Sequence, residues 1–186
     1  MTEITYVGVF VFITVLWVIV RATAAVKERR FDVRREAMLL TVYICLVVIA
    51  RMVYFPLHLE NGHIGKTVFD IHSILPFKIN LIPIVNLFEQ YAGWKVNIIG
   101  NTAMFIPVGI CWPLCFKKLD NIGKTVLAGG GLSLFIELSQ LLLVGRTTDV
   151  DDLMLNTAGV FIGAVIYFVT AKLSKPKGHT EQSEVL

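Results

Sequence analysis

The chain has 186 residues, of which 55% are hydrophobic and 17% are Asp, Glu, Lys or Arg, and its mean hydropathy is +0.71. Soluble domains carry about 25% charged residues, so this composition argues against a soluble globular domain. The formal net charge is only +3. A charge this small gives no support to a nucleic-acid-binding function, and we expect no nucleic-acid partner.

The apolar residues gather into stretches that are long enough to cross a bilayer as helices, which takes about 20 residues. The first stretch is followed, not preceded, by basic residues, which favours a retained helix over a signal peptide. We therefore predict an all-α integral membrane protein, a bundle of about five transmembrane helices. The predicted helices cover residues 4–20, 37–57, 96–116, 125–144 and 153–171.

Lysine and arginine residues fix the expected orientation, because they accumulate in cytoplasmic connections. They cluster in the link after the first helix, in the link between the third and fourth helices, and in the tail. These three segments lie on one side of the membrane if the chain crosses it five times. We thus expect an extracytoplasmic N-terminus and a cytoplasmic C-terminus in a multi-pass protein of the cell membrane. The basic residues are Arg21, Lys27, Arg29, Arg30, Arg34, Arg35, Lys117, Lys118, Lys124, Lys172, Lys175 and Lys177.

The long outer link between the second and third helices contains Pro76 and Pro83, and polar residues such as Asp70 and Lys78 interrupt its apolar residues. Proline and charge disfavour a sixth span. We expect a partly buried extracytoplasmic segment here, with a short interfacial helix over residues 83–95. We divide the chain into residues 1–36 (first helix and basic link), 37–171 (transmembrane core) and 172–186 (a disordered cytoplasmic tail).

Polar residues within or beside the predicted spans fall mostly toward the outer side. Such residues are costly in a membrane and are therefore candidates for function. Arg51 and Glu137 are expected at similar depth with opposite charge, which suggests an ion pair. We predict a polar chamber that opens to the outer leaflet and binds a ligand. Its walls would be Arg51, Asn80, Asn97, Asn101, Glu137, Gln140, Arg146, Asp149, Asp152 and Asn156.

Structural roles remain open for several of these groups. The asparagines could serve interhelical hydrogen bonding alone. Asp151 or Asp152 could cap the fifth helix, and a divalent cation near the aspartates stays an alternative, although the spacing does not match a calcium loop. We expect no cofactor and no metal site, and we interpret Cys45, Cys111 and Cys115 as apolar packing residues. Gly159 and Gly163 form a small-residue face on the fifth helix.

Several short motifs, in this order, resemble the VanZ-like family of membrane proteins, and the resemblance covers about residues 43–168. Ile84 stands where the family often has Phe after Asn-Leu-Ile-Pro, which is a mild departure. The VanZ-like part would thus make up most of the 37–171 core. The motifs are Asn80-Leu81-Ile82-Pro83, Asn97 with Gly100-Asn101, Phe105-Ile106-Pro107-Val108-Gly109, Glu137-Leu138-Ser139-Gln140, Arg146, Asp149-Val150-Asp151-Asp152 and Asn156-Thr157-Ala158-Gly159.

The resemblance implies a role at the bacterial cell surface, in resistance to glycopeptide antibiotics of the lipid-bearing teicoplanin type or in cell-envelope homeostasis. We expect membrane lipids as partners, with a lipoglycopeptide or a lipid-linked cell-wall precursor as further candidates for the chamber. Two alternatives remain. The protein could be an intramembrane enzyme that acts on a lipid-linked envelope intermediate, with Glu137 as general base. It could also be a structural subunit of an assembly, including a homo-oligomer, with Gly159 and Gly163 facing another subunit.

Overall fold

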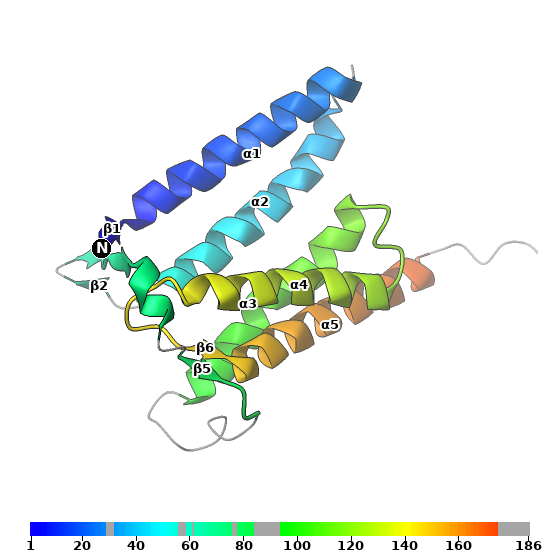
Figure 1. Cartoon of the computed structure of the whole chain (residues 1–186). Coiled ribbons are helices and arrows are strands. Elements are labelled where there is room, and N and C mark those ends of the chain that lie inside the picture. Colours follow the sequence, from blue (N-terminus) through cyan, green and yellow to red (C-terminus); the bar gives the residue numbers. More distant parts are fainter. Residues whose placement is uncertain (29–31, 56–58, 61, 76–77, 84–93, 175–186) are drawn as a thin grey trace, which may run out of the picture.

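The computed structural model describes residues 1–28, 32–55, 59–60, 62–75, 78–83 and 94–174. The described residues form a helical bundle whose five long helices are each apolar enough to cross a membrane, which confirms the predicted fold class. Figure 1 shows α3, α4 and α5 packed together, with α1 and α2 rising away from them. The helices are α1 (Tyr6–Glu28), α2 (Val33–Tyr54), α3 (Trp94–Cys115), α4 (Ile122–Gln140) and α5 (Val150–Leu173).

Polar caps set where three of the helices begin, and they begin before the predicted starts at 37, 125 and 153. Asp32 accepts hydrogen bonds from the backbone N–H groups of Arg34 and Arg35. Asn121 accepts from the N–H of Lys124, and Asp149 accepts from the N–H of Asp151. Hydropathy alone misses such first turns because they are polar. The expectation that Asp151 or Asp152 caps α5 is wrong: the cap is Asp149, and the other two lie in the first turn.

Helix α1 extends well past its predicted end at residue 20 and takes Arg21 and Lys27 into the helix. Alanine, arginine and lysine have high helix propensity, so the polar extension continues the apolar helix. None of the residues in the most apolar stretch of α1 is buried inside the structure. Helix α1 is thus the least integrated of the five.

The closest helix pair is α3 with α5, and glycines allow it. A Cβ atom built on Gly159 would lie 2.2 Å from the carbonyl oxygen of Thr102, and one on Gly163 would lie 2.1 Å from that of Ile106. Only glycine permits backbones to approach this closely. Gly159 and Gly163 therefore pack against α3 of the same chain. This result corrects the alternative in which they face another subunit.

The buried core lies where α2, α3, α4 and α5 meet. Phe105, Val108 and Val160 are fully buried there, and Cys45 and Ile49 of α2 pack against them. The three cysteines lie in the described part of the chain as free thiols. This core holds the helices in the register that positions the polar residues described below.

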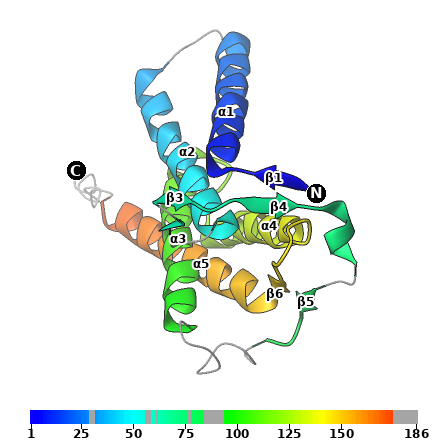
Figure 2. The ribbon, with the colours of Figure 1, turned by 90° about the vertical axis from the view of Figure 1, so that its left-hand side faces the viewer.

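Short strands gather at one end of the bundle, which we call the strand-capped end (Figure 1). It contains the last residues of α2 and α4 and the first residues of α3 and α5. In the antiparallel pair of β1 with β4, Glu3 lies opposite Val68, and in the parallel pair of β5 with β6, Asn80 lies opposite Asp149. Figure 2 shows both pairs. The strands are β1 (Thr2–Ile4), β2 (Leu59–Glu60), β3 (His63–Ile64), β4 (Thr67–Phe69), β5 (Ile79–Asn80) and β6 (Thr148–Asp149).

The outer link thus consists, where it is described, of short strands and a 3-10 helix (Ile71–Ile74) rather than a span. It docks on the turn between α4 and α5: the N–H of Asp70 donates to the carbonyl of Leu142 at 3.0 Å, and the N–H of Val144 donates to the carbonyl of Val68 at 3.0 Å. The short helix predicted over residues 83–95 and the tail after residue 174 lie almost entirely outside the described residues.

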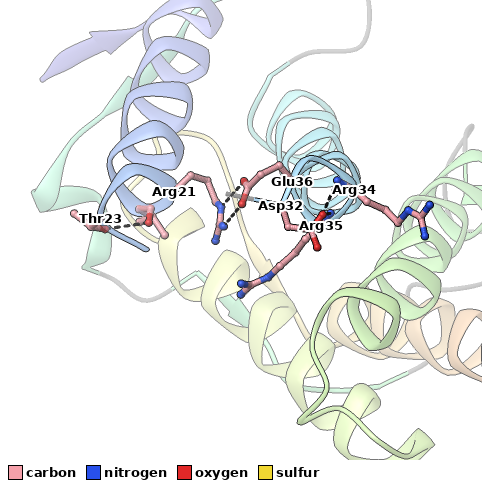
Figure 3. Close-up of polar contacts among 7 residues, drawn as sticks. Arg21, Thr23, Asp32, Arg34, Arg35 and Glu36 are labelled. Atoms are coloured by element: carbon pink, nitrogen blue, oxygen red, sulfur yellow. Dashed lines mark hydrogen bonds and ion pairs between the residues drawn. The ribbon is translucent and has the colours of Figure 1, made fainter. Parts of the chain in front are cut away.

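Both ends of α1 are held by polar contacts. At the strand-capped end, β1 pairs with β4. At the other end, Arg21 forms a two-pronged ion pair with Glu36 at the start of α2, beside the cap of Asp32 (Figure 3). Between them, the hydroxyl groups of Thr14 and Tyr43 lie 2.7 Å apart. These polar contacts position α1 together with ring contacts of Tyr6 with Phe55 and of Trp17 with Tyr43.

Candidate functional site

Most of the polar residues predicted to line a chamber lie together at the strand-capped end. They come from β5, the start of α3, the end of α4, and β6 with the start of α5, segments that are far apart in the sequence. Successive helices run in opposite directions, so α3 and α5 begin at the same end of the bundle at which α2 and α4 end. The described residues therefore bring together four carboxylates, of Glu137, Asp149, Asp151 and Asp152, which we call the carboxylate cluster.

Asp152 lies in the first turn of α5 and is held by two amides from α3. The side-chain amide of Asn101 donates to its Oδ1 atom at 2.5 Å, and that of Asn97 donates to the same atom at 3.2 Å. Asn101 also donates to the Oδ1 atom of Asn97 at 3.1 Å, as expected for residues four apart on one helix face. This three-residue network joins the start of α3 to the first turn of α5, about two helical turns before Gly159 contacts α3.

Asp149 has two structural tasks. Its Oδ1 atom accepts the N–H of Asp151 at 2.9 Å and so caps α5. The side-chain amide of Asn80 donates to both of its carboxylate oxygens at 3.2 Å, and the backbones of the two residues pair in the β5–β6 ladder. The outer link is thereby attached to the start of α5, which explains why Asn80 lies at the site despite its distance in sequence.

Glu137 is almost fully buried, with 3% of its surface exposed, the same fraction as Asp151. Its Oε2 atom accepts the backbone N–H of Asp149 at 3.1 Å, and its carbonyl oxygen accepts the hydroxyl of Thr148 at 2.7 Å. Arg146 lies close enough to act electrostatically on both Glu137 and Asp152. One guanidinium thus acts on two carboxylates of the cluster.

Gln140 and Asn156 link the helices behind this cluster. The amide of Gln140 donates to the carbonyl of Val53 on α2 at 3.4 Å, and that of Asn156 donates to the hydroxyl of Ser133 on α4 at 2.9 Å. Asn156 is only 2% exposed, and its Oδ1 atom has no hydrogen-bond partner among the described residues. The contacts that both residues make join helices.

Arg51 lies apart from the cluster, so the predicted ion pair with Glu137 is wrong. Its guanidinium lies 6.0 Å from the centre of the Tyr6 ring and donates to the carbonyl of Phe55 at 3.4 Å. The prediction compared how far Arg51 and Glu137 lie from the ends of their helices. It could not determine in which direction around α2 the Arg51 side chain points. Arg51 contacts α1 and the end of its own helix instead.

Sequence reasoning missed Tyr54, whose hydroxyl lies 2.6 Å from that of Ser139 and connects α2 to α4 beside Glu137. It also missed Thr148. The search selected charged residues, asparagine and glutamine, so it passed over a tyrosine and a threonine. The position of Tyr54 at the end of an apolar helix could have indicated it, because tyrosine is enriched at the membrane interface.

A family model described as VanZ/LLP1 matches residues 39–171, a range that contains α3, α4, most of α2 and α5, and every residue of the carboxylate cluster. Among curated proteins, the chain is similar to "Protein VanZ" of Enterococcus faecium, with 29% identity over 106 residues. The matched part is 57% of this chain and 60% of that relative, so the match spans about three fifths of the relative's length. No solved structure matches this chain.

Proposed function

This chain belongs to the VanZ/LLP1 family, and we propose that it binds the polar head of a membrane amphiphile at the carboxylate cluster, from the extracytoplasmic side. The clustering of basic residues in alternate connections supports that orientation. In the proposed topology, the strand-capped end lies at the outer membrane surface, and the tail lies in the cytoplasm. A head group in the outer leaflet then reaches the site without crossing the membrane.

The observation that carries the proposal is the gathering of Glu137, Asp149 and Asp152 with one nearby guanidinium among the described residues, that of Arg146. Buried like charges destabilise a fold, and hydrogen bonds from the surrounding amides offset this only in part. Proteins retain such arrangements at functional sites. A purely structural network would do as well with fewer charges.

The donors and acceptors indicate which head groups suit the site. The side-chain amides of Asn80, Asn97 and Asn101 already donate to aspartates. The carboxylate oxygens have room for further donors, since each can accept more than one hydrogen bond. A hydroxyl- or ammonium-bearing head fits them, and Arg146 can bind a phosphate or carboxylate on the same molecule.

In the cell, this binding would contribute to resistance against glycopeptides of the teicoplanin type or to homeostasis of the envelope, as the family resemblance implies. Such antibiotics are amphiphiles, as are lipid-linked cell-wall precursors. A protein that holds amphiphile heads in the outer leaflet changes how either of them is distributed at the membrane surface.

The test uses Glu137→Gln and Arg146→Ala in bacteria that depend on this protein for teicoplanin tolerance. Asp120→Asn is the control, because Asp120 lies exposed at the opposite end of the bundle and pairs there with Lys124. Teicoplanin susceptibility and the amount of protein in the membrane are measured together. We expect both site variants to lose protection at normal membrane levels while the control retains it. Full protection by both site variants would reject the site.

An enzymatic function is the alternative that the burial of Glu137 favours, because a carboxylate in an apolar environment suits proton transfer. In that case, the substrate would be a lipid-linked envelope intermediate. Incubation of the purified protein with lipid-linked cell-wall precursors, with and without a chelator, tests this. Turnover that Glu137→Gln abolishes would establish catalysis, and the absence of turnover across these substrates would leave amphiphile binding as the function.

A further inference from the structure

A pocket of about 340 Å³ lies between α1, α2 and α4. Its walls are apolar side chains from all three helices, among them Leu16 of α1, Ala50 of α2 and Leu132 of α4. Pockets for small ligands start at about 300 Å³, so this space is large enough for one narrow ligand.

The pocket opens sideways toward the membrane. Leu16 is 51% exposed and Phe135 is 67% exposed, although both line it. All three helices are long and apolar enough to span a bilayer, so acyl chains surround this opening. The lining residues on α2 run from Leu46 to Tyr54, which corresponds to about 12 Å along a helix at roughly 1.5 Å per residue. One leaflet of the hydrocarbon core is about 15 Å thick, so the pocket covers most of a leaflet.

At the strand-capped end of α2, the pocket comes within one residue of the proposed head-group site on α4. Tyr54 lines the pocket, and its hydroxyl lies 2.6 Å from that of Ser139. Ile136 also lines it and immediately precedes Glu137 on α4. An amphiphile with its head on the carboxylate cluster would therefore have this pocket beside it for its chain.

We propose that the pocket between α1, α2 and α4 takes one acyl chain of an outer-leaflet glycerolipid whose head lies on the carboxylate cluster. The inference rests on the proposed function for the position of the head. Water does not suit the space, because an ordered water needs two to four polar partners, and the polar groups of the lining side chains are the Trp17 indole N–H and the Tyr54 hydroxyl, which already bonds to Ser139. A helix of a second copy, about 10 Å across, does not fit a space of this size. An acyl chain fills it and restores the dispersion contacts that an empty space forfeits.

The pocket depends on a part of the chain that lies before the family match, because α1 precedes residue 39. The ion pair of Arg21 with Glu36 (Figure 3) keeps the α1 wall in place, together with the contact of Thr14 with Tyr43. Helix α1 and the part of the chain that the family model matches therefore determine together which lipid chains enter the pocket.

The experiment uses phosphatidylglycerol that carries a diazirine in its acyl chain, with the full-length protein in vesicles of this lipid and phosphatidylcholine. After illumination, labelled peptides are mapped by mass spectrometry. We expect label on α2 and α4 at the pocket, including Ala50 and Leu132, in excess over Phe161, which is 51% exposed on α5 and lies outside the pocket. Label spread evenly over the exposed apolar surface would overturn the proposal.

A matched pair of variants tests the pocket itself. Leu16→Trp fills it from α1, and Val18→Trp places the same side chain on the same helix at a residue that is 57% exposed and does not line the pocket. We expect the first to lose the pocket label and the second to keep it. A second pair, Leu132→Phe with Leu134→Phe as control, repeats the comparison on α4. Unchanged labelling in both filled variants would overturn the proposal.

Failure of this inference can be separated from failure of the head-group site. If Glu137→Gln loses teicoplanin protection while the label is not concentrated in the pocket, the head-group site stands and the chain pocket is wrong. If the label is concentrated in the pocket and lost in Leu16→Trp while Glu137→Gln keeps full protection, the chain pocket stands and the proposed function of the carboxylate cluster is wrong.

Discussion

The close approach of α3 and α5 makes Gly159→Ala a sharp test of the structure. The added Cβ atom would lie 2.2 Å from the carbonyl oxygen of Thr102 and 3.1 Å from the Cβ atom of Phe105. The first of these is a backbone atom, which cannot turn away as a long side chain can. The two helices must therefore separate where this residue lies.

The size of the effect follows from these distances. Ordinary contacts between heavy atoms begin near 3.5 Å, so the backbones have to move apart by about 1 Å. Overpacking of this kind destabilises by about 1–3 kcal/mol, and a rigid backbone contact belongs at the upper end. Alanine gains about 1 kcal/mol over glycine in helix propensity, which leaves a net loss of about 2 kcal/mol. Asn97 and Asp152 are bonded at 3.2 Å across the same helix pair, so a shift of that size also breaks their contact.

Thermal unfolding of the purified protein in detergent measures this loss. Gly131→Ala is the matched control, because nothing lies within 4 Å of the added Cβ atom on α4. We expect Gly159→Ala to unfold at lower temperature and Gly131→Ala to unfold at the same or a higher temperature. Equal stability of the two variants would refute the close packing of α3 against α5, and with it the register that brings the site together.

Two further predictions concern the attachment of α1 and the orientation of the chain. Arg21→Ala and Glu36→Ala should each destabilise the α1–α2 pair, and the double variant should lose little more than either single variant, because the two side chains form one ion pair that is 18% and 23% exposed. A double-mutant cycle in detergent measures this, and fully additive losses would show that the pair does not form. In intact cells, a membrane-impermeant maleimide should label Glu3→Cys but not Lys172→Cys, in a chain whose native cysteines are replaced. The reverse pattern would overturn the proposed orientation and the extracytoplasmic site.

The helices could be predicted from the sequence because a bilayer imposes length and apolarity on each span. Their first turns could not, because hydropathy does not register the caps of Asp32, Asn121 and Asp149. The strands were also missed. Pairs such as Thr2 with Phe69 join segments that lie far apart in the chain, and two or three residues carry no recognisable strand pattern.

The candidate site was predictable to the extent that helix geometry determines it. Asn97 and Asn101 are four residues apart, so they share a face, and the start of α5 must lie near the end of α4 because the connection is short. Arg51 shows the limit of this reasoning. Its depth could be inferred from its distance to the end of α2, but the direction of its side chain depends on how α2 packs, which spacing within one helix does not determine. Asn80 reaches the site through a ladder that no local pattern indicates.

Glu137 offers the means to separate a functional carboxylate from a structural one. Its Oε2 atom accepts the N–H of Asp149 at 3.1 Å, and a glutamine has a carbonyl oxygen that can accept the same bond. Glu137→Gln removes one negative charge next to Asp149 and Asp152, so repulsion falls while the hydrogen bond stays. We therefore expect the free energy of unfolding of Glu137→Gln to be unchanged or raised.

Glu137→Leu has the opposite expected sign, because it removes the acceptor as well as the charge. It leaves the partly buried N–H of Asp149 without this partner, which costs about 1 kcal/mol. Chemical unfolding of the two variants and of the unaltered protein gives the comparison, with teicoplanin susceptibility measured in parallel. If Glu137→Gln keeps its stability and loses protection, the charge serves the ligand, since the fold does not need it. If Glu137→Gln instead loses stability as Glu137→Leu does, the carboxylate stabilises the fold, and the argument for a head-group site at Glu137 fails.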